Sequence, residues 1–397
     1  MSTDVDLPAG SHDPARQEGA QLVDVDWESL EEGRTRFGRR RLLRWALVAG
    51  YLGLWGYDVW LVPARDSLLS FSIPLPWLGS VSTGLAPTNV DWLFGLTLLV
   101  AGQFVATGLA RNPRLRAYYW AQIRKNRVAM ASLWYLAIVF VLGLLGPTIL
   151  GQPELDVTAI HEPPLGFGGS LAHPLGTADG GEGILEIVLA GMRVSMQVAL
   201  IATTVSIVLA TAVGASAALA GGWIDELLMR GVDLLLTFPT FFLIVFLVYL
   251  YGGDLFVLVL ILALTGWGAT ARMVRSEALQ RTTETYVRAA EAAGASRWYV
   301  VRRHVVPNVS NTIVTAVTLL IPAMILTEAV IAFLGFGDPD VWSWGRVIAS
   351  GRGDLQHAWW VSTIPGLFLF TTVLAFNFLG DALRDALDPR HHPHTRR

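Results

Sequence analysis

The chain has 397 residues, of which 53% are hydrophobic and 15% are charged, and its net charge is −3. Soluble domains carry about 25% charged residues, so this composition excludes an ordinary soluble protein and indicates several membrane crossings. The sequence contains no cysteine, which excludes disulfides, thiolate metal sites and a cysteine nucleophile.

The first 33 residues or so are acidic and poor in apolar side chains, so they cannot bury a core. We therefore predict a disordered cytoplasmic tail over residues 1–40, and we expect no cleaved signal peptide because no apolar stretch lies near Met1. The arginines that end this tail directly precede an apolar run, which favours a membrane flank over a nucleic-acid patch. They are Arg34, Arg36, Arg39, Arg40, Arg41 and Arg44.

Apolar runs further along the chain predict eight membrane-spanning helices, since a bilayer core of about 30 Å needs about 20 residues at about 1.5 Å each. The predicted fold is an all-α integral membrane protein. The expected spans cover approximately residues 45–62, 92–110, 128–145, 198–220, 234–250, 255–271, 313–333 and 361–379. The first two, within residues 41–112, look like an appendage.

The distribution of basic residues predicts the topology, because cytoplasmic flanks are enriched in arginine and lysine. Both termini, including the tail at 391–397, are expected in the cytoplasm, and the loops expected outside are residues 63–91, 146–183 and 335–360. The apolar stretch 184–190 is too short to span and is expected at the membrane interface. Residues 221–233 are expected to form a short polar turn inside.

The segment 271–308 is polar and basic although long apolar runs flank it. A helical pattern with a break near Gly294 runs through it, since glycine can take a positive φ or permit close contact between two short helices. On the first helix, small side chains share one face with Tyr286, which would let another protein approach the backbone. These small residues are Ala289, Ala290 and Ala293.

The polar residues of this segment offer further contacts. Glu291 provides a carboxylate for a basic group of a partner, or for Arg288 or Arg302 of the chain itself. His304 and Pro307 mark the return of the chain toward the bilayer. The alternative interpretation is a solvated basic loop held by anionic lipid headgroups, which would explain the arginines alone.

Single polar residues elsewhere favour structural roles. Glu328, near the end of a span, is expected to make a structural pair, with contact to a transported substrate as the alternative. Arg193 and Asp233 lie near span ends, where pairing or snorkelling suffices. The terminal cluster His391, His392 and His394 is interpreted as incidental rather than as a metal site.

Several separated motifs resemble one family. Residues 286–296 (YVRAAEAAGAS) and 303–308 (RHVVPN) resemble the EAA loop of ABC-importer membrane subunits, the cytoplasmic helix that docks into an ATPase. Over about residues 120–390 the chain resembles the C-type permease of dipeptide and oligopeptide importers. The motifs that carry this resemblance are residues 173–177 with 191–195, 229–233 with 238–239, 328–329 with 333–337, 343–345, 365–366, and 377–385 with 388–390.

The resemblance implies a six-helix type I permease core in residues 113–390, preceded by two extra helices and containing a cytoplasmic coupling loop at 272–308. It further implies a homologous second permease, two ATPases that hold ATP and Mg²⁺, an extracytoplasmic binding protein and membrane lipid as partners, without nucleic acid. This chain itself would hold no cofactor or metal and catalyse nothing. The docking residues implied are Tyr286, Arg288, Ala289, Ala290, Glu291, Ala292, Ala293, Gly294, Ala295, Ser296, His304 and Pro307.

Two positions depart from the family pattern. Arg288 stands where the glutamate of the motif belongs, and Glu182 lies in an external stretch, residues 178–183, where an arginine is common. The first departure reverses the charge offered to the ATPase. The second changes the contacts available to the external segment.

Other classes of protein fit the residues less well. The chain lacks a G-x-x-x-x-G-K-[ST] phosphate loop, so a partner or an ion gradient must supply energy. A secondary transporter would favour intramembrane acids and inverted repeats, and a membrane enzyme would need titratable groups gathered at one depth; neither pattern stands out. Peptide is the substrate that the resemblance implies, with nickel or another small solute as the alternative.

Overall fold

The computed structural model describes residues 27–61, 69–75, 79–85, 87–111 and 113–387. The described residues divide into two units, one within residues 1–57 and the other within residues 58–397. Most of the predicted acidic tail and the histidines His391, His392 and His394 lie outside the described residues. The described part of the first unit is helical: it is the beginning of α1 (Trp27–Leu61), which contains the run of arginines.

The second unit is mostly helical, with one hairpin of two antiparallel strands in which Leu69 faces Leu85 and Leu75 faces Gly79. Its elements, in chain order, are β1 (Leu69–Leu75), β2 (Gly79–Leu85), α2 (Asn89–Arg111), α3 (Pro113–Lys125), α4 (Arg127–Ile149), α5 (Ile184–Ala220), α6 (Gly222–Thr237), α7 (Thr240–Tyr251), α8 (Leu255–Thr265), α9 (Gly268–Thr282), α10 (Thr285–Ala292), α11 (Arg297–Val300), the π-helix η3 (Val301–Val305), α12 (Val306–Asn308), α13 (Ser310–Phe333), α14 (Trp344–Ser350), the 3₁₀ turn η4 (Gly351–Gly353) and α15 (Trp359–Leu387).

Six helical stretches of the described chain are long and apolar enough to cross a membrane, or seven if the bent pair α6–α7 counts as one span. They confirm the all-α membrane fold; the six coincide with six of the eight expected spans, and the bent pair α6–α7 coincides with a seventh, 234–250. The six are 89–106, 127–149, 184–220, 255–282, 310–333 and 359–387. The remaining expected span, 45–62, falls within α1, which is not among these stretches. The β-hairpin was not predicted.

Two predictions about local structure are wrong. Residues 184–190 do not lie apart at an interface: Ile184 and Ile187 are fully buried and begin the 37-residue helix α5. Residues 221–233 do not form a turn either, because α6 occupies them and meets α7 at a bend of 85°. Polar residues caused both errors, and three of these residues form ion pairs with distant side chains: Arg193, Asp225 and Asp233.

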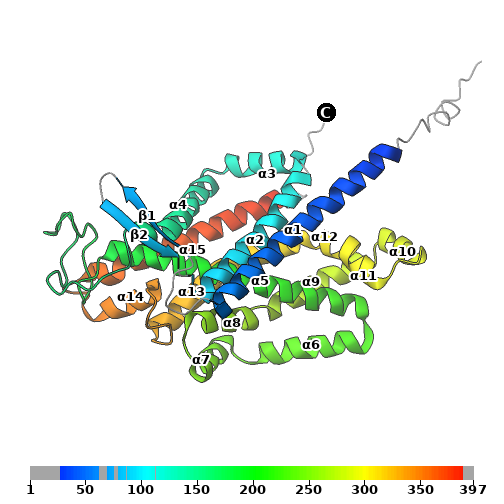
Figure 1. Cartoon of the computed structure of the whole chain (residues 1–397). Helices are drawn as coiled ribbons and strands as arrows, with labels where there is room; N and C mark the ends of the chain where they lie inside the picture. The colour runs from blue at the N-terminus through cyan, green and yellow to red at the C-terminus, as the bar shows by residue number, and fades with distance from the viewer. Residues whose placement is uncertain (1–26, 62–68, 76–78, 86, 112, 388–397) are drawn as a thin grey trace, which may run out of the picture. The chain divides into compact units, whose positions relative to one another are not determined.

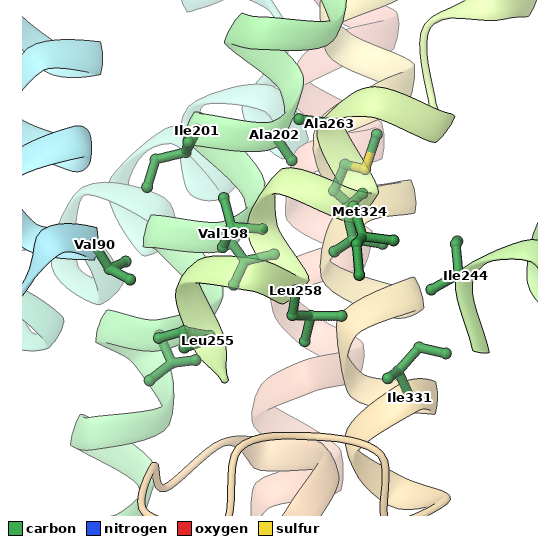
Figure 2. Close-up of a cluster of buried hydrophobic side chains, with 14 of the residues drawn as sticks. Val90, Val198, Ile201, Ala202, Ile244, Leu255, Leu258, Ala263, Met324 and Ile331 are labelled. Atoms are coloured by element: carbon green, nitrogen blue, oxygen red, sulfur yellow. The ribbon is translucent and has the colours of Figure 1, made fainter. Parts of the chain in front are cut away.

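A large apolar cluster holds α5 at the centre of the second unit. Figure 2 shows Val198, Ile201 and Ala202 of α5 among side chains of four other helices. The labelled neighbours are Val90 of α2, Ile244 of α7, Leu255, Leu258 and Ala263 of α8, and Met324 and Ile331 of α13. Within this unit, α10–α12 and α14 lie at opposite ends of the helices (Figure 1).

Candidate docking site at α10 to α12

The basic segment predicted to meet a partner folds as short helices joined by a tight turn. The amide of Ala295 donates to the carbonyl of Ala290 at 3.0 Å, and the amide of Gly294 donates to the carbonyl of Glu291 at 2.9 Å. This pair of hydrogen bonds is a Schellman motif, which requires a residue with positive φ. Gly294 supplies it with φ +84°, which confirms the predicted helix break.

After the turn, Ser296 starts the second helix, since its hydroxyl accepts from the amide of Tyr299 at 3.3 Å. The chain then widens into η3 and returns to the apolar helices through α12, where Pro307 is exposed. The π-helical turn shifts the side-chain period away from 3.6 residues. Residues beyond it therefore take faces that an ordinary helical pattern does not predict.

The inner face of the segment is anchored to two long helices. Val287 of α10 is fully buried beside Val300 and Val305. The same cluster contains Ala215 and Ala218 of α5 and Val274 and Ala278 of α9. α10 therefore packs on these helices through apolar contacts and is not a free loop.

The outer face of the segment carries a recess of about 640 Å³. Its lining is mostly small, and comprises Ala290, Ala293, Gly294, Ala295, Ser296, Tyr299 and His304. The ring of His304 lies between two tyrosines, with centroid distances of 6.0 Å to Tyr286 and 5.9 Å to Tyr299. A Cβ added to Gly294 would meet nothing within 4 Å, so the recess is open at that point.

The structure thus brings the recess-lining members of the predicted set together. Of the other predicted residues, Ala289, Ala292, Arg288 and Glu291 are exposed on α10. Sequence reasoning missed Tyr299, whose place beside His304 depends on the π-helical turn between them. The only sequence signal for it was the aromatic pair Trp298–Tyr299 in a basic segment.

Three arginines of this region are engaged within the chain. Arg275 of α9 donates to both carboxylate oxygens of Asp225 of α6, at 2.6 and 2.5 Å, and Arg272 donates to Asp233 at 2.5 Å. Arg281 binds Glu277 one turn earlier at 2.6 Å. These contacts confirm the expected structural role of Asp233. Three of the arginines that anionic lipid headgroups were suggested to hold are therefore paired with carboxylates of the chain itself.

Arg288 and Glu291 behave differently. Among the side chains that the structure describes, neither has an ion-pair partner, so the suggested pair between them does not form. The side chain of Arg302, the other suggested partner, lies outside the description. Both charges on α10 are exposed.

Two other residues singled out in the sequence have structural partners. Arg193 bonds to Asp91 of α2, as its expected structural role requires. Glu328 is 1% exposed and lies beside Ser343, at the start of α14, while its Oε2 has no hydrogen-bond partner among the described residues. Within the described residues, no group of three or more metal-ligating side chains exists.

The chain matches two known protein families. Residues 207–392 match the family described as binding-protein-dependent transport system inner membrane component, and residues 115–164 match the N-terminal transmembrane domain of oligopeptide transport permease C.

Individual relatives agree with these matches. The dipeptide transport system permease protein DppC of Bacillus subtilis is 33% identical over 275 residues, which is 68% of this chain and 84% of the relative. The oligopeptide transport system permease protein OppC of Mycobacterium tuberculosis is 37% identical over 271 residues, 67% of this chain and 91% of the relative. Among solved structures, the MetNI methionine ABC transporter in inward-facing conformations is 18% identical, with a TM-score of 0.43, covering 51% of this chain and 97% of that one.

Proposed function

The chain belongs to the family of binding-protein-dependent transport inner membrane components, and from this premise we propose that it conducts peptides and docks an ATPase through α10. Membership makes it a multi-pass permease subunit of an ABC importer. The work of such a subunit is mechanical: the ATPases hold ATP and Mg²⁺, and this chain moves in response.

The observation that carries the docking proposal is the two-sided character of α10. One side presents exposed alanines and the open recess, while Val287 on another side is locked into a cluster with α5 and α9. A displacement of α10 by a partner would therefore be transmitted directly to α5 and α9. A partner can drive a conformational change only through contacts that differ between the two states, and this surface is where such contacts would form.

The recess defines what the partner would bring. Alanine, glycine and serine leave a hollow between α10 and α11, and two aromatic rings form its far wall. A bulky apolar side chain of the ATPase fits this lining, with Arg288 offering a charge at the margin of the contact. The partner surface would therefore combine a protruding apolar side chain with acidic residues that face Arg288.

Peptide as the transported substrate is supported by the relatives, whose names specify dipeptide and oligopeptide transport. By the same family logic, a second homologous permease would complete the pathway and an extracytoplasmic binding protein would deliver the substrate. The chain would provide half of the membrane pathway, without a cofactor of its own.

The proposed orientation places α10–α12 and both termini in the cytoplasm. The distribution of arginines supports this arrangement, and α14 would then lie on the outer side, because it occupies the opposite end of the helices (Figure 1). The irregular stretch after α4, which contains no lysine or arginine between residues 150 and 183, would be external as well.

The docking proposal is tested by placing a bulky side chain at Gly294, which lines the recess. Gly294→Trp should reduce the amount of ATPase that co-purifies with the assembled permease by at least about tenfold, because the indole would occupy the partner's place in the contact. Insertion into the membrane should be unchanged, measured as the amount of chain in the membrane fraction. Normal recovery of the ATPase with this variant would overturn the assignment.

A matched control separates docking from backbone strain. Gly335 has almost the same backbone conformation, with φ +85°, and an added Cβ there also meets nothing within 4 Å. Gly335→Trp therefore imposes a similar backbone strain, but at the opposite end of the helices, where α14 lies. It should leave the co-purified ATPase unchanged, and loss of ATPase in both variants would indicate general destabilisation.

A further inference from the structure

The helix α2 lies outside both stretches that match known families, yet it is built into the central apolar cluster. Val90 and Phe94 of α2 are each 5% exposed and pack among Val194 and Val198 of α5 (Figure 2 shows Val90 and Val198). The ring of Phe94 also lies 6.3 Å from that of Phe140 in α4. Such burial is unlike that of a helix that merely tethers the chain.

A polar contact within this apolar surface joins α2 to α5. One carboxylate oxygen of Asp91 accepts from the guanidinium of Arg193 and from the amide nitrogen of Gln197, the latter at 2.7 Å. The other oxygen accepts from the amide and the hydroxyl of Thr88, at 2.9 and 2.8 Å. Arg193 and Gln197 are one helical turn apart, so both reach the same point on α2.

This contact leaves α5 little freedom relative to α2. A half-buried carboxylate or guanidinium that loses its partner is costly, so separating the two helices would leave both charges unpaired. Asp91 and Arg193 keep 18% and 32% of their side chains exposed, which leaves them mostly withdrawn from the surroundings. The ion pair therefore holds α2 and α5 together.

Other faces of the same part of α5 are also held. The indole nitrogen of Trp344 in α14 donates to the carbonyl of Val188 at 3.1 Å. A Cβ on Gly191 would lie 2.3 Å from the Trp344 ring, so only glycine permits this contact. On a further side, Gly143 of α4 lies against the backbone of Met192. Together with Asp91 of α2, these contacts show that three elements, α2, α4 and α14, pack against the first four turns of α5.

We propose that α2 is a working part of the transport core, in which Asp91 is a positioning residue that makes α2 and the beginning of α5 move as one body during transport. The sequence-based interpretation of α2 as an appendage gives way to a helix that supplies, within the same chain, the counter-charge for Arg193. The rigid body would comprise α2, residues 184–197 and the elements packed on them.

The test uses the fact that the chain has no cysteine of its own. In the assembled importer, cysteine pairs that join Val90 or Phe94 to Val194 or Val198 would link α2 covalently to α5 after oxidation. Uptake of a labelled dipeptide into proteoliposomes should be the same before and after oxidation. A block of uptake that a reductant reverses would show that the helices must separate, and would overturn the proposal.

A second variant shows whether Asp91 acts by positioning. Asp91→Ala should reduce dipeptide uptake at least about tenfold, because Arg193 loses its partner, and oxidation of the cysteine pair in the same variant should restore most of it. The exchange Asp91→Arg with Arg193→Asp should also recover uptake. Wild-type uptake by Asp91→Ala, or loss that neither the cross-link nor the exchange repairs, would overturn the positioning role.

A control on the same helix is Thr97→Val. Thr97 is 5% exposed, but its hydroxyl bonds to Leu93 of its own helix at 2.9 Å. This change should leave uptake within twofold of wild type, because no bond to α5 is lost. Failure of the docking proposal would not mimic these results, because it would appear as normal recovery of the ATPase with Gly294→Trp. The α2 variants are instead compared by dipeptide uptake with a wild type that transports.

Discussion

Asp225 and Arg275 form a two-bond ion pair that joins α6 to α9, the helix that leads into α10. The side chains keep 18% and 32% of their surface exposed. A second pair, Asp233 with Arg272, connects the same two helices further along. Two acids of α6, Asp225 and Asp233, therefore hold this helix against α9, at the base of the proposed docking segment.

We predict that Asp225→Asn lowers the free energy of unfolding by about 1–3 kcal/mol, because a charge-assisted bond is lost and a half-buried guanidinium is left without its counter-ion. The thermal midpoint of the purified chain in detergent measures this. The neighbouring Glu226→Gln is the control: Glu226 binds Arg230 at 3.3 Å with its side chain 68% exposed, so its removal should change the free energy of unfolding by less than about 0.5 kcal/mol. Equal shifts for the two variants would contradict the prediction.

The sequence predicted the long apolar helices well, because periodicity and hydropathy are local properties. It failed where polar side chains are satisfied by distant residues. The stretch 184–190 was separated from its helix because Glu186 interrupts it and Arg193 follows it. The partner of Arg193 is Asp91, about a hundred positions earlier, which a local pattern does not reveal. In the same way, residues 221–233 looked like a turn until Arg275 and Arg272 appeared as partners of their acids.

At the candidate site, the prediction succeeded for features set by backbone chemistry. A glycine after a run of alanines predicts the end of a helix, and Gly294 takes the required positive φ. The recess itself was not predictable, because it depends on the π-helical turn that places His304 against Tyr286 and Tyr299. The charge of Arg288 was visible in the sequence, whereas its lack of an ion pair among the described side chains was not.

Val287 tests the anchoring of α10. Val287→Ala removes two methyl groups from a fully buried site and should cost about 1–3 kcal/mol, with the loss concentrated in α10. Hydrogen exchange of the amides in α10 should accelerate while that in α5 stays unchanged. Val128→Ala on α4 is the control, since Val128 is 50% exposed. Equal protection of α10 in wild type and Val287→Ala would show that the apolar anchor is unimportant.

Arg288 tests the charge that the docking surface presents. Arg288→Glu should lower the amount of bound ATPase at least about tenfold at low salt, because the reversed charge would face the partner's acids. The effect should shrink at about 1 M salt, where the Debye length falls to about 3 Å. Glu284→Gln, an exposed change before the first turn of α10, should have little effect. Stronger ATPase binding by Arg288→Glu would show that the partner surface is basic instead.

Glu328 decides between a structural role and a place in the transport pathway. Its carboxyl is buried beside Ser343, whose hydroxyl accepts from the amide of Arg346 at the start of α14. Glu328→Gln keeps the size and the acceptor, so dipeptide uptake should stay within about twofold of wild type with an unchanged KM. Ser343→Ala removes the capping bond to the amide of Arg346 and should lower the free energy of unfolding by about 1–2 kcal/mol. A raised KM in Glu328→Gln, with the thermal midpoint unchanged, would instead place this carboxyl in contact with the substrate, because only a group that meets the substrate would alter its binding without altering the fold.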